Sequence, residues 1–598
     1  MTILAELARL YERLAKEGKA PPRGYSFEKI GGAVELDADG NVLAIHDLRA
    51  PDEKGKLQPR IMAVPEGGTR TSGIKPNTLW DKTAYALGIT VRKDSRKKPL
   101  LDEAGKPQPE TEGRVSKEHA AFVKHHEELL EDRQDEGLAA LLAFVRRWRP
   151  EMFAERNFDP ELLDQNFVFR LSGDTHADGT PRYIHERPAA RALIAEHNEE
   201  SGAQGLCLIT GQNAPAVRLH PMIRGVQGAQ SSGAAIVTFN LDAFTSHGKE
   251  QGENAPVSEE AAFAYGAALN ALLARGSGRN IRIGDATVVF WAETPETGKA
   301  ATIEELMRGA LAPDEKTETE KLASLLADIA TGRAATAEFD PATRIFILGL
   351  APNAARLSVR FWRPGTLGDF ARNVTRFWND LAQDPPAWKK GPPTAWSLLY
   401  EVAVQRKAEN ILPRLGGDLM RAVLSGAPYP QTLLSGVITR IRADHDINPH
   451  RVAIIAAVLR RNFKEDIPMS LDRSNPDPAY RLGRLFAVLE KIQEKALPGL
   501  NATIKDRYFA AAMATPARIF PLLVRNAMHH LSKLRKDGKG GLARWFESEM
   551  GEIWSDLEPR LPRSLNLEAQ GRFVAGYYHQ RLARKNKADA TKSEGAAA

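Results

Sequence analysis

The stretch RIFILGLAPNAARLSVRFW, residues 344–362, decides the fold class of the chain. Its two apolar runs, RIFILGL at 344–350 and LSVRFW at 357–362, predict two β-strands joined by an Ala-Pro-Asn turn. These are the last strands that the pattern predicts, because after about residue 395 the apolar positions follow helical spacing. The sequence therefore predicts an α+β fold: a mixed α/β N-terminal region with several short β-sheets, followed by an all-helical C-terminal bundle.

Upstream of this stretch, apolar runs alternate with turn residues and helical segments. We expect further strands at 32–47 (a hairpin on an Asp-Gly turn), 60–65, 167–171, 206–210, 234–239 and 281–291. We expect helical segments at 116–148, in the second half of 69–88, and in an acidic insert near 301–333.

A chain of 598 residues is too long for a single hydrophobic core. The sequence predicts a mixed α/β domain over 1–395, a helical connector over 396–468 and a helical bundle over 469–598. Within the bundle, DPAYRLGRLFAVLEKIQEKAL (477–497) has its apolar residues at helical spacing.

Bulk composition favours a soluble globular protein. Hydrophobic residues make up 42% and charged residues 26% of the chain, and no apolar run is long enough for a membrane span. The N-terminal stretch MTILAELARLYERLAKEGK lacks the apolar centre of a signal peptide. One cysteine, Cys207, excludes a disulfide framework and a Cys-based zinc site, and fits a reducing cytoplasm.

Positive charge is concentrated in two places. Residues 469–598 carry 22 Lys and Arg against 14 Asp and Glu, a net of +8, whereas the chain as a whole carries +6. A second excess lies between residues 60 and 98, and its members are Arg60, Arg70, Lys75, Lys82, Arg92, Lys93, Arg96, Lys97 and Lys98. Both patches indicate contact with a polyanion such as nucleic acid, with ordinary solvated surface as the alternative.

Motifs for catalysis fail on inspection. Gly248-Lys249 is followed by Glu250, and a nucleotide phosphate loop needs Ser or Thr there. No G-x-S-x-G turn occurs, and His125-His126 is predicted to lie on a solvated helix face. Asp444-His445-Asp446, with His450 nearby, leaves a metal-dependent nuclease open as an alternative, although capping between helices is the preferred interpretation. The sequence predicts no metal site and no cofactor, and disfavours an enzyme.

The segment 210–254 has an unusual composition. It is rich in Gly, Ser, Asn, Gln, His, Arg and Lys, and Asp242 is its only carboxylate before Glu250. Such a mixture suits an irregular polyanion whose phosphates and base edges are met at many angles. A glycine-rich structural connector is the alternative.

Several long motifs, in order, carry a family resemblance. Three motifs carry it, in this order: TRTSGIKPNTLWDKTAYALG, CLITGQNAPAVRLHPMIRGVQGAQSSGAAIVTFNLDAFTSHGKEQGENAPVSEEAAFAYGAALNALL and MSLDRSNPDPAYRLGRLFAVLEKIQEKA. With these motifs the chain resembles the large subunit of the type I-C CRISPR surveillance complex, Cascade. The resemblance extends over essentially the whole chain, and the insert near 301–333 is its least distinctive part.

The resemblance implies a non-catalytic, cytoplasmic subunit of a ribonucleoprotein built on a CRISPR RNA. Such a subunit inspects double-stranded DNA for a short flanking motif (PAM), aids duplex opening, stabilises the R-loop and recruits a helicase-nuclease, while guide pairing reads the sequence. The implied partners are CRISPR RNA, target double-stranded DNA, Cascade backbone subunits, the handle-binding subunit, small subunits and the helicase-nuclease, without a membrane. An RNA-binding scaffold with no DNA role remains a further alternative.

Residue type within these regions suggests the contacts. We expect the PAM reader in Arg70, Ser72, Gly73, Lys75, Asn77 and Lys82. We expect RNA-handle or DNA contacts from Arg218, His220, Arg224, Gln227, Gln230, Lys249 and Asn254. A strand-supporting basic patch is expected at Lys533, Arg535, Lys536 and Lys539. The resemblance also implies an internal translation start at Met469, which would release the helical C-terminus as a small subunit.

Overall fold

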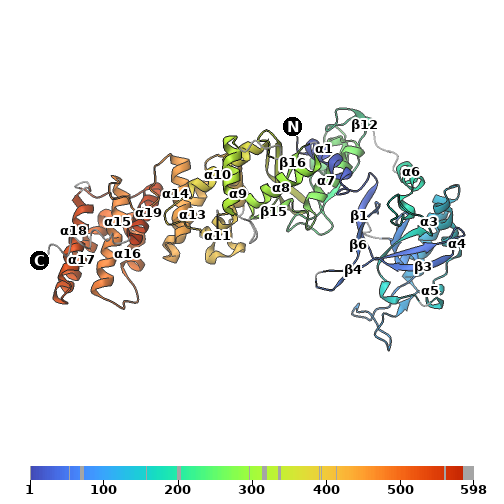
Figure 1. Ribbon diagram of the computed structural model, residues 1–598, viewed down its shortest axis with the longest axis horizontal. Helices are drawn as coiled ribbons and strands as arrows, with labels where there is room; N and C mark the ends of the chain where they lie inside the picture. Colours follow the sequence, from blue (N-terminus) through green and yellow to red (C-terminus); the bar gives the residue numbers. More distant parts are fainter. Residues whose placement is uncertain are drawn as a thin grey trace. The chain divides into compact units, whose positions relative to one another are not determined.

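The computed structural model describes residues 2–52, 54–67, 73–156, 158–197, 204–294, 296–312, 319–333, 339–388, 391, 393–412, 414–555, 557 and 560–583. The fold is α+β, as predicted. Figure 1 shows the elements in chain order, and contacts divide the chain into two compact units. The N-terminal unit comprises Met1–Pro221 and Thr238–Ala271, and the C-terminal unit comprises Met222–Val237 and Leu272–Ala598. The three-part division at 395 and 468 stays a prediction.

The N-terminal unit is built on a four-stranded sheet of order β3-β2-β10-β7. Its strands are β2 (Gly32–Leu36), β3 (Val42–Asp47), β7 (Trp80–Lys82) and β10 (Asn166–Leu171). β2 and β3 form the predicted antiparallel hairpin, while β10 lies parallel to β2 and antiparallel to β7. β7 was not predicted; it precedes a four-residue helix, α2 (Thr83–Ala86), where only a loop and a helix were expected.

Both faces of this sheet are covered. One face packs against α3 (Arg114–Leu130), α4 (Glu136–Arg147) and α5 (Met152–Glu155) through a core that includes Phe122, Phe144 and Phe169. The other face packs against a separate antiparallel pair, β1 (Tyr25–Ile30) and β6 (Arg60–Pro65), through Ile30, Val64 and Trp80. Other elements of the unit are α1 (Ile3–Lys16), β4 (Ala50–Pro51), β5 (Leu57–Gln58), α6 (Pro188–His197), β11 (Gln204–Leu206), β12 (Asn213–Pro215) and most of α7 (Glu259–Leu273).

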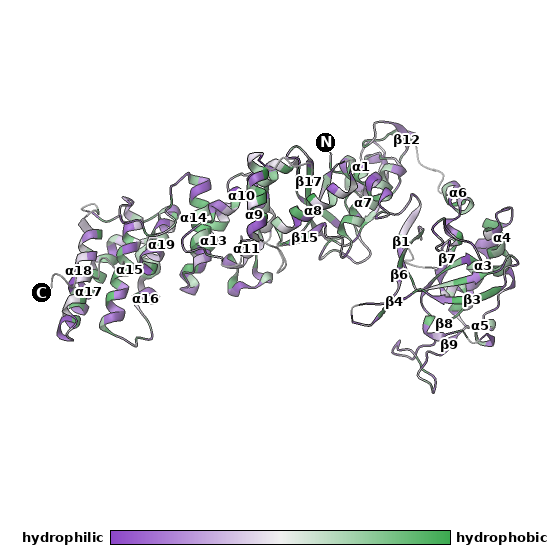
Figure 2. Cartoon of the chain, viewed as in Figure 1, coloured by the Kyte–Doolittle hydropathy of each residue, from purple (hydrophilic) through white to green (hydrophobic). Residues whose placement is uncertain are grey.

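A narrow arm extends from this unit between α2 and α3. Its stem pairs β8 (Thr90–Val91) with β9 (Pro109–Glu110), and residues 92–108 lie beyond the stem. Figure 2 shows the arm beside the labels β8 and β9 as a largely hydrophilic extension. Every residue from 92 to 106 is exposed, so the arm contributes no core to its unit.

A six-stranded sheet of order β13-β14-β18-β17-β16-β15 forms one part of the C-terminal unit. Its strands are β13 (Met222–Ile223), β14 (Ala234–Ala235), β15 (Asn280–Ile283), β16 (Ala286–Glu293), β17 (Arg344–Asn353) and β18 (Arg356–Thr366). β17 and β18 pair antiparallel from Arg344 opposite Thr366 to Asn353 opposite Arg356. The two strands predicted from 344–362 are therefore confirmed.

Helices pack on this sheet and continue away from it. Those before residue 395 are α8 (Thr297–Leu311), α9 (Thr319–Thr331) and α10 (Leu367–Asp380). Those after it are α11 (Ala395–Val402), α12 (Leu415–Ser425), α13 (Gln431–Asp444), α14 (Pro449–Phe463), α15 (Pro478–Ala496), α16 (Ile504–Ala514), α17 (Pro516–Lys536), α18 (Gly540–Ser555) and α19 (Leu567–Leu582). The part of the chain described after residue 395 contains no strand, as predicted. None of the helices described is both long and apolar enough to cross a membrane.

Two glycines bring α15 and α19 into backbone contact. A Cβ added at Gly483 would lie 2.0 Å from the carbonyl oxygen of Phe573, and a Cβ at Gly576 would lie 2.0 Å from that of Tyr480. Real Cβ atoms do not approach other heavy atoms this closely, so glycine is required at both positions. The pair α15 and α19 therefore forms the closest-packed seam of the bundle that these contacts reveal.

The core of the C-terminal unit continues across Met469. A Cβ at Gly571 of α19 would lie 2.9 Å from Ile455 and 3.3 Å from Leu459, both on α14. Met469 itself is 53% exposed, and its carbonyl accepts a hydrogen bond of 2.8 Å from the Asp384 N–H. Helices before and after Met469 therefore share one packed surface.

Two predicted strands are largely absent. At 206–210 only Leu206 belongs to a strand, because Cys207 and Gln212 close a tight turn and Leu208 is 62% exposed. At 234–239 the ladder stops after Ala235. In both places the apolar run predicted a buried strand, but most of its residues lie in turns and loops. The strands predicted at 60–65, 167–171 and 281–291 are confirmed.

Candidate nucleic-acid interface

The loop that leads into β7 is held from below by a buried carboxylate. Asp81 is fully buried, and its two oxygens accept hydrogen bonds from the backbone N–H of Asn77 (2.8 Å) and of Lys82 (2.7 Å). The indole N–H of Trp80 donates to the Pro65 carbonyl at 2.8 Å. These bonds fix the backbone of 77–82 against the sheet, so a side chain on this loop starts from a defined position.

A buried histidine holds the same loop from the helix beneath it. The backbone N–H of Leu79 donates to Nε2 of His126 at 2.9 Å, and Nδ1 of His126 lies 2.8 Å from the Phe122 carbonyl. Leu79 has a positive φ of 64°, a conformation that L-residues avoid unless their surroundings impose it. Burial lowers the pKa of His126 to about 3, and the hydrogen bond to the Phe122 carbonyl only partly opposes this. The ring is therefore neutral and carries its proton on Nδ1.

The prediction of a solvated face for His125-His126 is wrong for His126, which is fully buried. The ring lies with Phe122 and Leu130 on the apolar face of α3. Spacing of four residues between these three positions was the available signal. His125 does reach a partner as well, since its Nε2 lies 3.0 Å from the Thr78 hydroxyl.

The predicted PAM readers differ in accessibility. Lys75 and Lys82 are exposed, and Gly73 has a φ of +87° with open space where a Cβ would stand. Asn77 is only 8% exposed. Arg70 and Ser72 lie outside the described residues. Lys75 and Lys82 are thus the charged side chains that the described part of this loop presents to solvent, beside the exposed Ile74.

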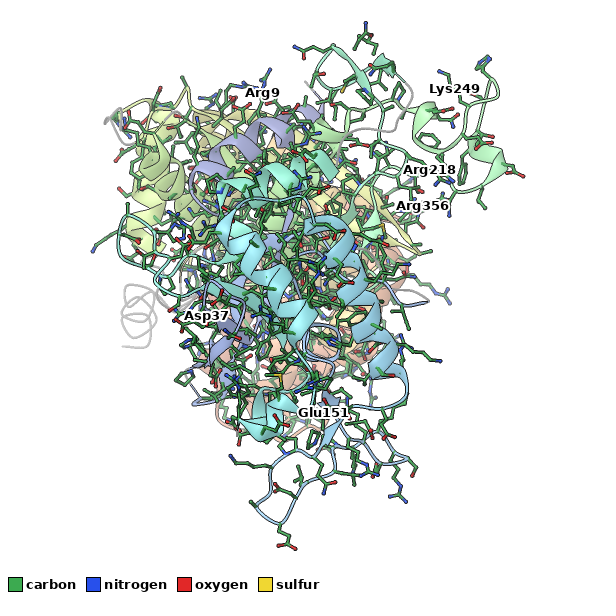
Figure 3. All side chains as sticks on the ribbon, turned by 90° about the vertical axis from the view of Figure 1, so that its right-hand side faces the viewer. Arg9, Asp37, Glu151, Arg218, Lys249 and Arg356 are labelled. Carbon is green, nitrogen blue, oxygen red and sulfur yellow. The ribbon has the colours of Figure 1, made fainter. Side chains whose placement is uncertain are left out.

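The second predicted region is organised by pairing between 216–218 and 252–258. The Val217 N–H donates to the Val257 carbonyl at 2.8 Å, and the Gly252 N–H donates to the Arg218 carbonyl at 2.9 Å. A Cβ at Gly252 would lie 1.9 Å from the Val217 carbonyl oxygen, so this approach needs glycine. Arg218 is exposed beside this contact, on a loop that Figure 3 shows together with Lys249.

Asn254 and His220 have structural partners inside the unit. The Asn254 side chain donates to the carbonyls of Lys249 and Gln251 and accepts from the Ser246 N–H, which closes the loop over 246–254. His220 is 8% exposed, with its Nδ1 2.8 Å from the Tyr265 hydroxyl, and burial lowers its pKa. Lys249, by contrast, projects from an exposed turn, so Gly248-Lys249 forms a surface loop and not a phosphate-binding helix start.

Cys207 sits at the base of the same region. It is 2% exposed, and the backbone N–H of Ser258 donates to its Sγ at 3.2 Å. Burial would raise the pKa of the thiol, but hydrogen bonds from Ser258 and Thr210 lower it to about 7. The sulfur therefore acts as an acceptor at the entrance to α7.

The remaining three residues predicted with this region belong to the other unit. Arg224, Gln227 and Gln230 are exposed on the loop between β13 and β14, at the edge of the six-stranded sheet. The Gln227 N–H donates to the Thr287 hydroxyl of β16 at 3.1 Å, which anchors the loop to the sheet. The seven predicted residues thus fall into two groups, one in each unit.

Helix α17 carries Lys533, Arg535 and Lys536 of the predicted C-terminal patch, and Lys539 lies beyond its end. Lys533 pairs with Asp537 at 2.7 Å and Arg535 pairs with Glu547, whereas Lys536 and Lys539 are exposed. The sequence of this helix contains no Asp or Glu. Arg518 and Arg525, which sequence reasoning missed, are exposed on it and have no ion-pair partner among the described residues. The cationic surface therefore extends over the length of the helix, about 30 Å at 1.5 Å per residue.

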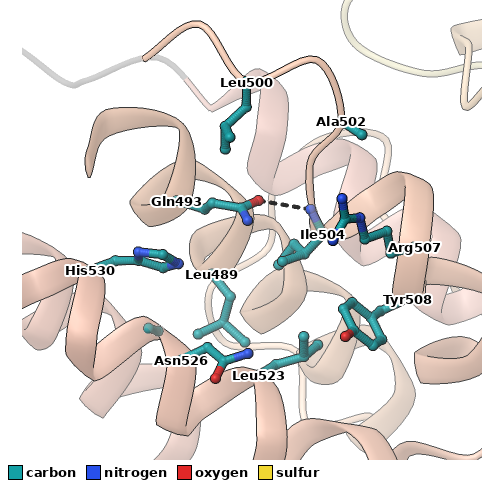
Figure 4. Close-up of a pocket in the computed structure, with 11 residues that line it drawn as sticks. Leu489, Gln493, Leu500, Ala502, Ile504, Arg507, Tyr508, Leu523, Asn526 and His530 are labelled. Atoms are coloured by element: carbon teal, nitrogen blue, oxygen red, sulfur yellow. Dashed lines mark hydrogen bonds between the residues drawn. The ribbon is translucent and has the colours of Figure 1, made fainter. Parts of the chain in front are cut away.

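A pocket lies beside α17 within the bundle. It is lined by residues of α15, α16 and α17, including Gln493, Arg507, Asn526 and His530 (Figure 4). Gln493 accepts the Ile504 N–H at 2.8 Å and so closes the start of α16. With a volume of about 180 Å³ it is smaller than the roughly 300–1,000 Å³ typical of ligand sites, and we assign it no ligand.

The acidic residues of the alternative metal site form ion pairs with arginines. Arg451 is 1% exposed and donates to Asp444 at 2.7 Å, and Arg406 donates to Asp446 at 2.8 Å. His445 ends α13 in a left-handed conformation, and His450 stacks on Trp388 at 4.7 Å. In the described parts of the chain, no group of three or more His, Cys, Asp or Glu side chains is placed to hold a metal ion. The cluster instead ties α13 to α14 through buried charge.

Comparison with known proteins adds the family. The search of curated proteins found no match. A family model described as CRISPR-associated protein (Cas_Csd1) matches residues 7–585, nearly the whole chain. Because the match spans both compact units, the cationic loops and α17 all lie within it. The chain therefore belongs to the Cas_Csd1 family of CRISPR-associated proteins, the large subunit of type I-C Cascade.

Proposed function

We propose that this chain is a non-catalytic subunit that recognises the PAM of invading double-stranded DNA, helps to open the duplex and stabilises the R-loop. The supporting observation is the loop over 73–82, which presents Lys75 and Lys82 while Asp81 and His126 fix its backbone. Base edges are read by side chains held in defined positions, and a short flanking motif needs only a few of them. Pairing between the CRISPR RNA and the target strand reads the rest of the sequence.

Removing the Lys75 ammonium should weaken binding to DNA that carries the correct flank. For Lys75→Ala we expect roughly tenfold weaker binding to that duplex, because a good base contact contributes about 1–3 kcal/mol of discrimination. Gel-shift titrations of the assembled complex on correct and altered flanks measure the ratio between the two. Lys117→Ala, an exposed lysine on α3, is the matched control. An unchanged ratio between flanks in Lys75→Ala would reject Lys75 as a reader.

The C-terminal unit is proposed to support displaced single strands and to help recruit the helicase-nuclease. α17 offers exposed Arg518, Arg525 and Lys536 on one helix without an acidic residue, and a cationic track of this kind follows a sugar-phosphate backbone without reading sequence. The exposed cations Arg218, Arg224 and Lys249 are proposed to contact the RNA handle or target DNA.

Two experiments separate this function from its alternatives. Purified protein incubated with Mn²⁺ and labelled DNA should leave the DNA intact; cleavage that is lost in His445→Ala would favour a metal-dependent nuclease. Complex that binds its guide yet shows no preference for flanked duplex would favour an RNA-binding scaffold. The arginine pairing of Asp444 and Asp446 supports the non-catalytic proposal.

We also propose that translation starting at Met469 yields a separate small subunit. The residue precedes α15, so a fragment from 469 keeps α15 to α19 and the Gly483–Gly576 contacts intact. Replacing the Met469 codon with a leucine codon should remove a small C-terminal product from immunoblots against the C-terminus while full-length protein persists. Replacing the Met513 codon is the control, because a start there would cut into α16. A small product that survives the Met469 change would refute this start.

A further inference from the structure

The arm beyond β8 and β9 is a branched structure with two tips. Three backbone hydrogen bonds join Arg92, Leu100 and Gln108 in a ring: Arg92 N–H to Gln108 O, Gln108 N–H to Leu100 O, and Leu100 N–H to Arg92 O, each at 2.8–2.9 Å. From this junction the chain makes one tight turn over 94–98 and a second over 102–106. The arm is thus a compact hydrogen-bonded platform, although it contains no core.

The turn over 94–98 repeats a design found three more times in the N-terminal unit. In each, an Asp begins the turn, its N–H donates to the carbonyl of the fifth residue, and its carbonyl accepts the N–H of the fourth. Its carboxylate also accepts the N–H groups of the third and fifth residues. The four turns begin at Asp37, Asp52, Asp94 and Asp102.

The fourth residue of this turn has a left-handed backbone conformation. It is glycine in three of the four turns and lysine in the other. Gly40, Gly55 and Gly105 hold the position with φ of +80°, +76° and +78°. In the turn that begins at Asp94 the residue is Lys97, with φ of +61°. A residue with a Cβ is disfavoured in this conformation relative to glycine. Glycine at position 97 would adopt this conformation with less strain, so folding does not explain the lysine. The Lys97 side chain is then expected to have another role.

The tip around Lys97 presents unpaired positive charge. Arg96, Lys97 and Lys98 are exposed and have no ion-pair partner among the described residues. Two other lysines of the arm are paired: Lys93 with Asp164 at 2.7 Å and Lys106 with Asp159 at 3.5 Å. One carboxylate oxygen of Asp94 accepts hydrogen bonds from the backbone N–H groups of Arg96 and Lys98 within the turn. Three consecutive cations are therefore available to an outside partner.

We propose that the tip Arg96-Lys97-Lys98 binds backbone phosphates of duplex DNA, with Lys97 retained in its strained conformation for that contact. A two-stranded ribbon is narrow enough to approach a DNA groove about 12 Å wide, and adjacent cations can meet phosphates along its edge. This inference rests on the proposed DNA-binding function, which it extends to a second contact outside the 73–82 loop.

The variant Lys97→Gly tests the contact without harming the turn. Glycine is the residue that the three sister turns use, so folding should be unaffected or slightly improved. Binding of a fluorescent 30-base-pair duplex to the purified full-length protein, followed by anisotropy from 50 to 200 mM KCl, should weaken roughly threefold to tenfold, and the slope of log K against log salt should decrease by about 0.9. Adding Arg96→Ala should enlarge both changes.

Control variants distinguish a failure of the Lys97 contact from a failure of the proposed DNA-binding function. Lys56→Ala removes an exposed lysine at the fifth position of a sister turn and should leave affinity unchanged. Wild-type protein that does not bind duplex DNA would overturn the proposed function. Wild-type binding with an unchanged Lys97→Gly variant, or an equal loss in Lys56→Ala, would overturn the inference alone. A loss confined to single-stranded DNA or to RNA would overturn the assignment to duplex.

Discussion

Gly483→Ala should destabilise the C-terminal helical bundle by more than about 3 kcal/mol. The new methyl group would meet the Phe573 carbonyl at 2.0 Å and the Tyr577 nitrogen at 2.8 Å, and both are backbone atoms that cannot turn aside. Helices α15 and α19 would have to separate, at a cost at or above the roughly 1–3 kcal/mol typical of overpacked cores. Separation would also strain buried bonds across the seam, such as Tyr577 O–H to Glu490 at 2.5 Å.

Gly551→Ala on α18 is the matched control. Nothing lies within 4 Å of the position of its Cβ, and the residue is exposed in a helix. Alanine there should stabilise by up to about 1 kcal/mol through helix propensity. Hydrogen exchange of peptides from α15 and α19 reads the local effect of each variant. Protection in Gly483→Ala equal to that of wild type would show that the seam can relax, and would contradict the rigid contact described here.

His126→Ala should destabilise the N-terminal unit by about 3 kcal/mol near neutral pH. The change leaves the buried Leu79 N–H without its acceptor, which costs about 1–3 kcal/mol, and opens a cavity beneath β7. His126→Gln places an amide oxygen near the position of Nε2 and should retain most of the stability. Exchange of the Leu79 amide is the direct measurement, and unchanged exchange in His126→Ala would refute the role of the ring.

Acid should loosen the same loop in the wild type. The folded-state pKa of His126, about 3, lies below its unfolded value near 6.5, so the unfolded state binds more protons between these values. Stability is therefore full above pH 6.5 and is lost as pH falls. At pH 5 the loss from this group is about 2 kcal/mol. His126→Gln lacks the titrating ring and should reduce the difference between pH 7 and pH 5 by that amount; an equal pH dependence in the two proteins would contradict the assignment.

Helices and strands could be predicted from the sequence more reliably than the contacts between them. Strands β17 and β18 were readable because long apolar runs flank a turn, and α15 was readable because its apolar face repeats at helical spacing. Gly483 and Gly576 gave no such signal, because a glycine within a helix shows its purpose only when the partner helix is known. The run at 206–210 was misread because burial, and not apolarity alone, makes a strand.

The candidate site shows the same limit at the level of side chains. Residue type grouped Lys75 with Asn77 and Lys249 with Asn254, yet the two lysines are exposed while Asn77 is buried and Asn254 closes its own loop. Amide side chains serve backbone groups as readily as they serve ligands, so composition cannot tell the two uses apart. Lys97 is the opposite case, since only comparison among folded turns shows that glycine would fit better.

The contact of Gly571 with Ile455 and Leu459 has a consequence for any polypeptide made from Met469 onward. Such a product lacks α13 and α14, so the surface of α19 around Gly571 would be uncovered in it, whereas α14 covers that surface in the full-length chain. One gene would then supply two versions of the same bundle, one with this face capped and one with it open.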